Sequence, residues 1–422
     1  MRSLGLFEGV GVELEYMIVD ADSLDVLPRS DEVIYSLAHE YVTEVEHGAL
    51  AWSNELVLHV LEIKTNGPAS GLRGLEDLFV ADLQQIAKVL AGMKGRLMPG
   101  AAHPWMNPER ETRLWPHEAN EIYETFDRIF GCRGHGWSNL QCTHLNLPFS
   151  GDAEFARLHA AIRLVLPLIP ALAASSPILD GRLTGVMDSR LHYYRENQKK
   201  IPSITGRVIP EPVFTRRDYE ERILEPMYAD IAPFDPDEVL HDEWLNARGA
   251  IARFDRSTIE IRIIDIQECP AADMAILHAI VCVLRALVAE KWQPLARQQR
   301  ADTDALNTIL AATTHTAESA VIRDRDYLDA FGIRARDATA GQVWQHLVGS
   351  VVAPDDDFTD SRARAMSVLL GQGTLSRRIV RAVVGENSGV AARIALDRDR
   401  LHHVYAVLCD CVAENRLFQN GS

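Results

Sequence analysis

Apolar and polar residues alternate along several short segments of the chain, and this two-residue period is typical of strands with one buried face. The first such segment contains GVELEYMIVD and predicts a strand over residues 5–20, with Glu13 and Glu15 on one face. The same pattern, bounded by turn residues, predicts four more strands: 55–64, 96–103, 139–147 and 250–266, the last with a turn near 255–257.

Other segments place apolar residues every three or four positions, which is typical of helices packed on a core. This period predicts helices over 72–90, 153–172 and 273–292. From about residue 295 onward only helical patterns occur, for example over 379–384 and 401–417. Strands that alternate with helices before a helical region predict an α+β fold, with an antiparallel sheet and helices on one face.

The same patterns suggest how the chain is divided. Residues 1–295 form the predicted catalytic region, and residues 296–422 form a helical C-terminal region packed on the same domain. Within the first region, residues 177–240 are rich in turn formers. We expect this stretch to form an irregular cover over an active site.

A second acidic strand segment, STIEIRIID, lies far from the first. Its residues Glu260 and Arg262 share one face, and isoleucines form the other. Charged side chains that face inward from a strand are costly unless they are paired or bound to a cation. Glu260 and Arg262 are therefore either a plain ion pair, or a metal-binding carboxylate beside a guanidinium that binds phosphate or carboxylate.

Two further carboxylates, Glu55 and Glu62, are candidate ligands for the same metal site. Their odd spacing places them on opposite faces of a regular strand. They converge only if Glu55 precedes the strand or a bulge intervenes. Glu13 and Glu15 are also candidate metal ligands, and the equally simple alternative is that they lie on a strand face exposed to solvent.

His144, Asn146 and Arg190 complete the set of candidate residues. His144 shares a strand face with Cys142 and Asn146, and it is either a structural histidine or a ligand for a divalent ion. Arg190 and Asn146 are candidates for substrate binding, with Arg190 holding a substrate carboxylate. The alternative for Arg190 is an ordinary surface arginine.

The composition narrows the classes of partner. The 422 residues carry a net charge of -17 with a pI of about 5.3, which disfavours nucleic acid and anionic membranes and favours a cytoplasmic protein. Proline or charged residues interrupt the longest apolar runs, so no membrane span is expected. The six cysteines show no CxxC pair and no zinc spacing. The sequence also lacks the Walker A, dinucleotide-binding and nucleophile-elbow motifs, so a nucleotide would need another architecture.

Taken in order, several segments resemble the glutamate–cysteine ligase type 2 family, also called carboxylate–amine ligases. These segments are GVELEYMIVD, LEIKTNGP, PGAAHP, CTHLNLP, ALAASSPILDGRLTG and IEIRIIDIQ, within residues 5–295. The chain departs from the family's Trp-Trp-Asp-Ile-Arg approach to the late strand, because residues 244–248 read WLNAR. Residues 296–422 carry no strong family signature. Both departures bear on substrate identity more than on ATP chemistry.

The resemblance implies a glutamine-synthetase-like fold, in which a curved antiparallel sheet cradles ATP and Mg²⁺, or Mn²⁺ in its place. It implies ATP-dependent amide formation between an amino-acid carboxylate and an amine, through an acyl phosphate. Matched by motif, the family's metal site falls on Glu13, Glu15, Glu55, Glu62, His144 and Glu260, and its catalytic pair falls on Glu260 and Arg262. We also expect a homo-oligomer, for example a dimer.

Two other functions fit the same residues. A metal-dependent amide hydrolase could use the same carboxylates and His144. A binding protein without catalysis could keep the fold, although buried carboxylates without a ligand would burden its stability.

Overall fold

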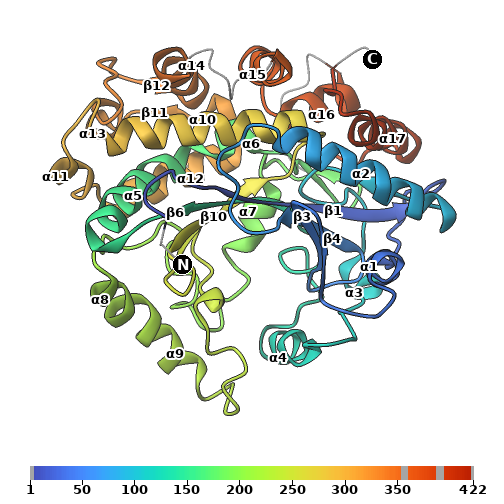
Figure 1. Ribbon diagram of the computed structural model, residues 1–422. Coiled ribbons are helices and arrows are strands. Elements are labelled where there is room, and N and C mark those ends of the chain that lie inside the picture. The colour runs from blue at the N-terminus through green and yellow to red at the C-terminus, as the bar shows by residue number, and fades with distance from the viewer. Residues whose placement is uncertain (1–3, 353–359, 386–393, 420–422) are drawn as a thin grey trace.

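The computed structural model describes residues 4–352, 360–385 and 394–419. Its main element is an antiparallel sheet in the order β2-β3-β4-β1-β6-β10-β9, with β5 also paired to β1. The strands are β1 (Gly11–Asp20), β2 (Glu44–His47), β3 (Leu50–Asn54), β4 (Val60–Thr65), β5 (Gly95–Met98), β6 (Cys142–Pro148), β9 (Ala250–Arg253) and β10 (Thr258–Asp265). In Figure 1, β3 and β4 turn towards the side of α4, so the sheet is curved.

Layers of helices cover one face of the sheet, as the sequence predicts. In Figure 1, α2, α5 and α10 lie above the sheet, and α14 to α17 lie above those helices. The bounds in this half are α2 (Leu75–Gly92), α5 (Gly151–Val165), α6 (Pro170–Ala173), α10 (Pro270–Val288), α11 (Leu295–Gln298), α12 (Thr303–Thr316), α13 (Arg325–Asp329), α14 (Ala340–Val351), α15 (Asp360–Gln372), α16 (Leu375–Val384) and α17 (Arg398–Glu414).

Shorter elements border the opposite face of the sheet (Figure 1). They are α1 (Ser30–Ala38), α3 (Pro108–Glu111), α4 (Asn120–Phe130), α7 (Ser189–Tyr194), α8 (Arg216–Tyr219) and α9 (Glu225–Ile231). The predicted irregular cover over 177–240 is therefore partly helical, and it also holds the short pair β7 (Ile178–Leu179) and β8 (Arg182–Leu183).

The alternation in β1 separates the core from the open face. Val12, Leu14, Tyr16 and Ile18 are fully buried in one hydrophobic core with residues of α2, α10 and α14. Helix α10 is apolar and long enough to cross a membrane by length and composition, but 72% of its apolar window is buried inside the protein, as in a core helix. Since the apolar side chains of the strands face these helices, the intervening acidic side chains face the other way.

Three sequence predictions about the elements are wrong. The strand expected over 55–64 begins only at Val60, and the hairpin β2–β3 before it was not predicted. All five residues of β3 are buried, so the strand lacks the alternating pattern that would reveal it. The strand expected over 96–103 ends at Met98. The C-terminal region is not wholly helical, because β11 (Val321–Ile322) pairs with β12 (Ala338–Thr339).

Candidate active site

Strand pairing gathers the acidic side chains on the face opposite the core. Glu15 of β1 lies directly opposite Glu62 of β4, and Glu13 lies opposite His144 of β6. On the next strand, Glu260 lies opposite Asn146. Directly opposed residues in an antiparallel pair project to the same face, so three strand pairs bring these groups together.

Glu55 joins the cluster from the loop between β3 and β4. Because β4 begins at Val60, Glu55 precedes the strand, which is one of the two conditions for its convergence with Glu62. Oxygens of Glu15, Glu55 and Glu62 lie within 4.8 Å of one another, as do ligand atoms of Glu13, Glu62 and His144. Oε1 of Glu260 lies 3.9 Å from Nδ1 of His144. The structure thus brings all six predicted metal ligands together.

Hydrogen bonds hold these side chains in place. The ring Nδ1 of His144 lies 2.6 Å from Oε2 of Glu13, and the Asn146 amide donates to Oε1 of the same carboxylate over 2.9 Å. The Ser53 hydroxyl donates to Oε1 of Glu62 over 2.6 Å. These contacts fix the orientation of the carboxylates before any ligand binds.

Burial and neighbouring charges shift the pKa values of three carboxylates in the cluster. Burial raises the pKa of Glu62 to about 7, with Lys64 opposing the rise and Glu13 adding to it. Burial and the charges of Glu15 and Glu62 raise the pKa of Glu55 well above its usual value. Burial also opposes ionisation of Glu13, but His144 outweighs it and lowers the pKa to about 2. A bound cation would relieve this repulsion.

Arg262 forms the ion pair with Glu260 that the sequence allowed, and its role in binding phosphate or carboxylate stays a prediction. Its Nε donates to Oε1 of Glu260 over 2.8 Å, and its Nη1 donates to the main-chain oxygen of Asn246 over 3.2 Å. The side chain is also part of a cavity wall beside the cluster. The ion pair therefore holds a guanidinium at the edge of the acidic site.

Arg190 is buried, so the surface-arginine alternative is wrong. Its Nε donates to Oδ1 of Asp265 over 2.6 Å, and its Nη2 donates to the main-chain oxygen of Arg262 over 3.2 Å. It contributes to the same cavity wall as Arg262. Its role in substrate binding stays a prediction.

Two cavities meet the acidic cluster from different sides. The first, which we call the aromatic cavity, has a volume of about 400 Å³ and is lined by Glu15, Glu55, Tyr123, Phe126, Trp137, Cys142, His144, Arg190, Tyr194, Trp244 and Arg262, among others. The second, the turn cavity, has a volume of about 680 Å³ and is lined by Glu13, Lys64, Asn146, residues 65–68 and the β9–β10 turn at 255–258, among others. The predicted substrate residues Arg190 and Asn146 thus lie at different cavities.

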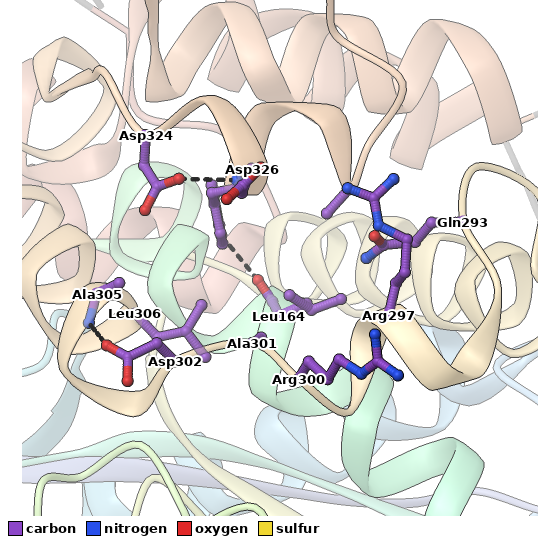
Figure 2. A pocket seen from close by; sticks show the side chains of 12 residues that line it. Leu164, Gln293, Arg297, Arg300, Ala301, Asp302, Ala305, Leu306, Asp324 and Asp326 are labelled. Atoms are coloured by element: carbon purple, nitrogen blue, oxygen red, sulfur yellow. Dashed lines mark hydrogen bonds between the residues drawn. The ribbon is translucent and has the colours of Figure 1, made fainter.

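A further hollow of about 330 Å³ lies away from the cluster, among α5, α11, α12 and α13 (Figure 2). Asp302 and Asp324 on its wall cap α12 and α13, accepting hydrogen bonds from main-chain N–H groups. Arg297 and Arg300 are exposed. Its charged groups are accounted for by helix capping and solvation, whereas the carboxylates of the acidic cluster are buried or half-buried and border two cavities.

Sequence reasoning missed several residues of the site. Ser53 lies on the unpredicted strand β3, directly opposite Glu62. Cys142 lies two positions before His144, and the only indication of its place in the site was that the two residues share a strand face. Tyr123, Phe126 and Trp137 reach the site from α4 and the segment that follows it.

Comparisons with known proteins agree with this architecture. The family profile described as glutamate–cysteine ligase family 2 matches residues 9–347. An uncharacterized protein of Archaeoglobus fulgidus is 33% identical over 79% of this chain and 91% of its own length. A Bradyrhizobium protein provisionally named glutamate–cysteine ligase 2 is 29% identical, and the match spans 66% of this chain and 60% of that relative.

The crystal structure of glutamate–cysteine ligase from Francisella tularensis in complex with AMP superimposes with a TM-score of 0.57 at 10% identity. The superposition covers 98% of this chain and 90% of that one. At this identity the likeness concerns the fold alone.

Proposed function

Because the chain belongs to the glutamate–cysteine ligase family 2, we propose that it is an ATP-dependent carboxylate–amine ligase that forms an amide through an acyl phosphate. The observation that carries this proposal is the cluster of Glu13, Glu15, Glu55 and Glu62 between two cavities. Carboxylates in this number suit a reaction that must neutralise the charge of phosphate groups.

The donor set fits Mg²⁺, with Mn²⁺ as an alternative. Mg²⁺ prefers oxygen ligands, and burial, together with neighbouring carboxylates, raises the pKa values of Glu55 and Glu62, which a bound cation would lower again. Glu13, Glu15, Glu55, Glu62 and Glu260 would hold the ions, and His144 would support them. When bound, the ions would neutralise phosphate charge and orient the phosphate oxygens.

The two cavities suggest separate binding places for the nucleotide and for the acid and amine. The turn cavity is the larger and carries Lys64 and Arg256, so we place the nucleotide there. The aromatic cavity carries Arg262 at its edge and apolar rings on its walls, so we place the acid and the amine there. In this arrangement the γ-phosphate lies over the acidic cluster, between the two sets of reactants.

Arg262 would act on the transferring group. A substrate carboxylate oxygen attacks the γ-phosphorus, ADP leaves, and the guanidinium of Arg262 stabilises the charge on the phosphoryl oxygens. The amine nitrogen then attacks the carbonyl carbon of the acyl phosphate, releasing phosphate and one proton. No side-chain nucleophile is required, because positioning and electrostatics supply most of the rate.

The test is ATP-dependent phosphate release by the purified chain with Mg²⁺ and a panel of amino acids paired with amines. Glutamate and cysteine are tested first, because the family takes its name from them. Apolar and aromatic amino acids and amines are tested next. We expect ADP, phosphate and an amide only when acid, amine and ATP are all present. Glu260→Gln should retain the fold and lose turnover. Hydrolysis of amides without ATP would instead support the metal-dependent hydrolase.

A further inference from the structure

Three buried side chains of different chemistry converge at one corner of the acidic cluster. Sγ of Cys142 lies 3.1 Å from Oε1 of Glu15 and 3.1 Å from Nε2 of His144, and Nε2 lies 3.8 Å from the same oxygen. All three residues line the aromatic cavity. One sulfur, one nitrogen and one oxygen therefore face a common point at the cavity wall.

Each of these groups is oriented by a second contact that leaves its ligand atom available. The N–H of Cys142 donates to Oε2 of Glu15 over 2.9 Å, which leaves Oε1 for the shared point. Glu13 contacts Nδ1 of His144 over 2.6 Å, which turns Nε2 towards Cys142. A carboxylate on the far nitrogen of a histidine is the usual support for a metal-binding imidazole.

The separations suit a tetrahedral ion. Zinc bonds of the usual lengths, at tetrahedral angles, separate their ligand atoms by about 3.3–3.6 Å, close to the spacing found here. Mg²⁺ prefers oxygen ligands and gains little from sulfur, whereas thiolate and imidazole favour Zn²⁺ and related ions.

We propose that Glu15, Cys142 and His144 form a site for a thiophilic divalent cation of the Zn²⁺ type, with the fourth position open to the aromatic cavity. Three protein ligands with one open position is the arrangement of catalytic zinc sites. On binding, the Cys142 thiol proton and any proton on Nε2 of His144 leave to solvent, so that thiolate and neutral imidazole bind the ion. Glu15 and His144 also belong to the set that would hold or support Mg²⁺, so the two kinds of ion compete for these two ligands. Glu13, Glu55, Glu62 and Glu260 stay available for Mg²⁺ while the Zn²⁺-type ion is bound. The sequence showed no zinc spacing, because two ligands lie two residues apart and the third lies on another strand.

The experiment uses Co²⁺ as a spectroscopic probe on the full chain after treatment with a chelator, without ATP. With excess Mg²⁺ present to occupy the carboxylate site, we expect one Co²⁺ per chain to give tetrahedral visible bands and a near-ultraviolet thiolate-to-metal charge-transfer band. Cys142→Ser keeps a hydrogen-bonding group of similar size and should remove the charge-transfer band. It should also weaken Zn²⁺ binding by roughly tenfold or more in a chelator competition.

Cys282→Ser is the matched control. Sγ of Cys282 lies 3.4 Å from Nε2 of His278, and these two residues form the other cysteine–histidine contact found among the described residues. This variant should keep the band. A wild-type spectrum without a thiolate band would overturn the proposal, even if Cys142→Ser fails to fold. A band that persists in Cys142→Ser and disappears in Cys282→Ser would overturn it as well. Neither result depends on ligase turnover, so the proposed function is tested separately.

Discussion

Replacing Glu62 by glutamine should make the metal-free protein more stable while it removes Mg²⁺ binding. Glutamine has nearly the same shape and can still accept the hydrogen bond from Ser53. It lacks the charge that is buried beside Glu13 and Glu15. The substitution therefore isolates the electrostatic cost of the acidic cluster.

The magnitude follows from the pKa of Glu62, which burial raises from 4.5 to about 7. Because the folded state holds the proton more tightly, stability is present below pH 4.5 and is lost as the pH rises through 7. At about 1.36 kcal/mol per pKa unit, ionised Glu62 costs about 3 kcal/mol above that pH. Glu62→Gln avoids this cost, so at pH 8 its free energy of unfolding should exceed that of wild type by up to about 3 kcal/mol.

The assay is urea unfolding at pH 8, first with EDTA and then with Mg²⁺. Mg²⁺ should stabilise wild type and have little effect on Glu62→Gln. Glu44→Gln is the control, because Glu44 also contacts Lys64 but is half exposed and lies outside the cluster. Its effect should stay within about 1 kcal/mol. If Glu62→Gln is no more stable than wild type in EDTA, or if Mg²⁺ stabilises both equally, the electrostatic account is wrong.

Three further outcomes are expected. Mg²⁺ with ATP should raise the melting temperature, since a ligand at 100 times its dissociation constant adds about 2.7 kcal/mol, and an unchanged melt at saturating ATP would count against the ligase. Arg262→Lys should lower turnover at least tenfold, which is about 1.4 kcal/mol of activation barrier, with little change in melting temperature, because lysine lacks the planar guanidinium that binds two phosphate oxygens at once. If the variant is destabilised but keeps its turnover, Arg262 does not act on the phosphoryl group. Burial lowers the pKa of His103 to about 4, and its Nδ1 accepts hydrogen bonds from the N–H groups of Trp105 and Met106. The contribution of neutral His103 to the free energy of unfolding is therefore present above pH 6.5 and is lost as the pH falls towards 4. Urea unfolding of wild type and His103→Gln across this range should differ by about 3 kcal/mol in pH dependence, and parallel curves would contradict this.

The sequence predicts much of the acidic cluster, because strand alternation is a local property. Glu13 and Glu15 face away from apolar neighbours, and the same holds for Glu260 and Arg262. The path of the chain before β4 is not local. The pattern alone left Glu55 with two routes into the site, and only the position of β4 after the β2–β3 hairpin decides between them.

The aromatic cavity could not be predicted for a related reason. Phe126 lies on α4, Trp137 follows that helix, and Trp244 belongs to a segment more than a hundred residues later. The rings of Phe126 and Trp137 lie 5.4 Å apart, and those of Phe126 and Trp244 lie 5.9 Å apart. None of these positions has a periodic signal that distinguishes a cavity wall from ordinary core packing, because the contacts depend on how distant loops fold over the sheet.

The place of Arg262 depends on a buried network behind it. Arg190 donates both to Asp265 and to the main-chain oxygen of Arg262, so it supports the strand from the side of α7. At the same place, a β-bulge between Ile261 and Ile264 shifts the pairing of β10 with β6. Bulges redirect the side chains that follow them, and removing Arg190 would leave the Asp265 charge buried without its partner. The network and the bulge together hold a guanidinium towards the aromatic cavity while the neighbouring isoleucines remain in the core.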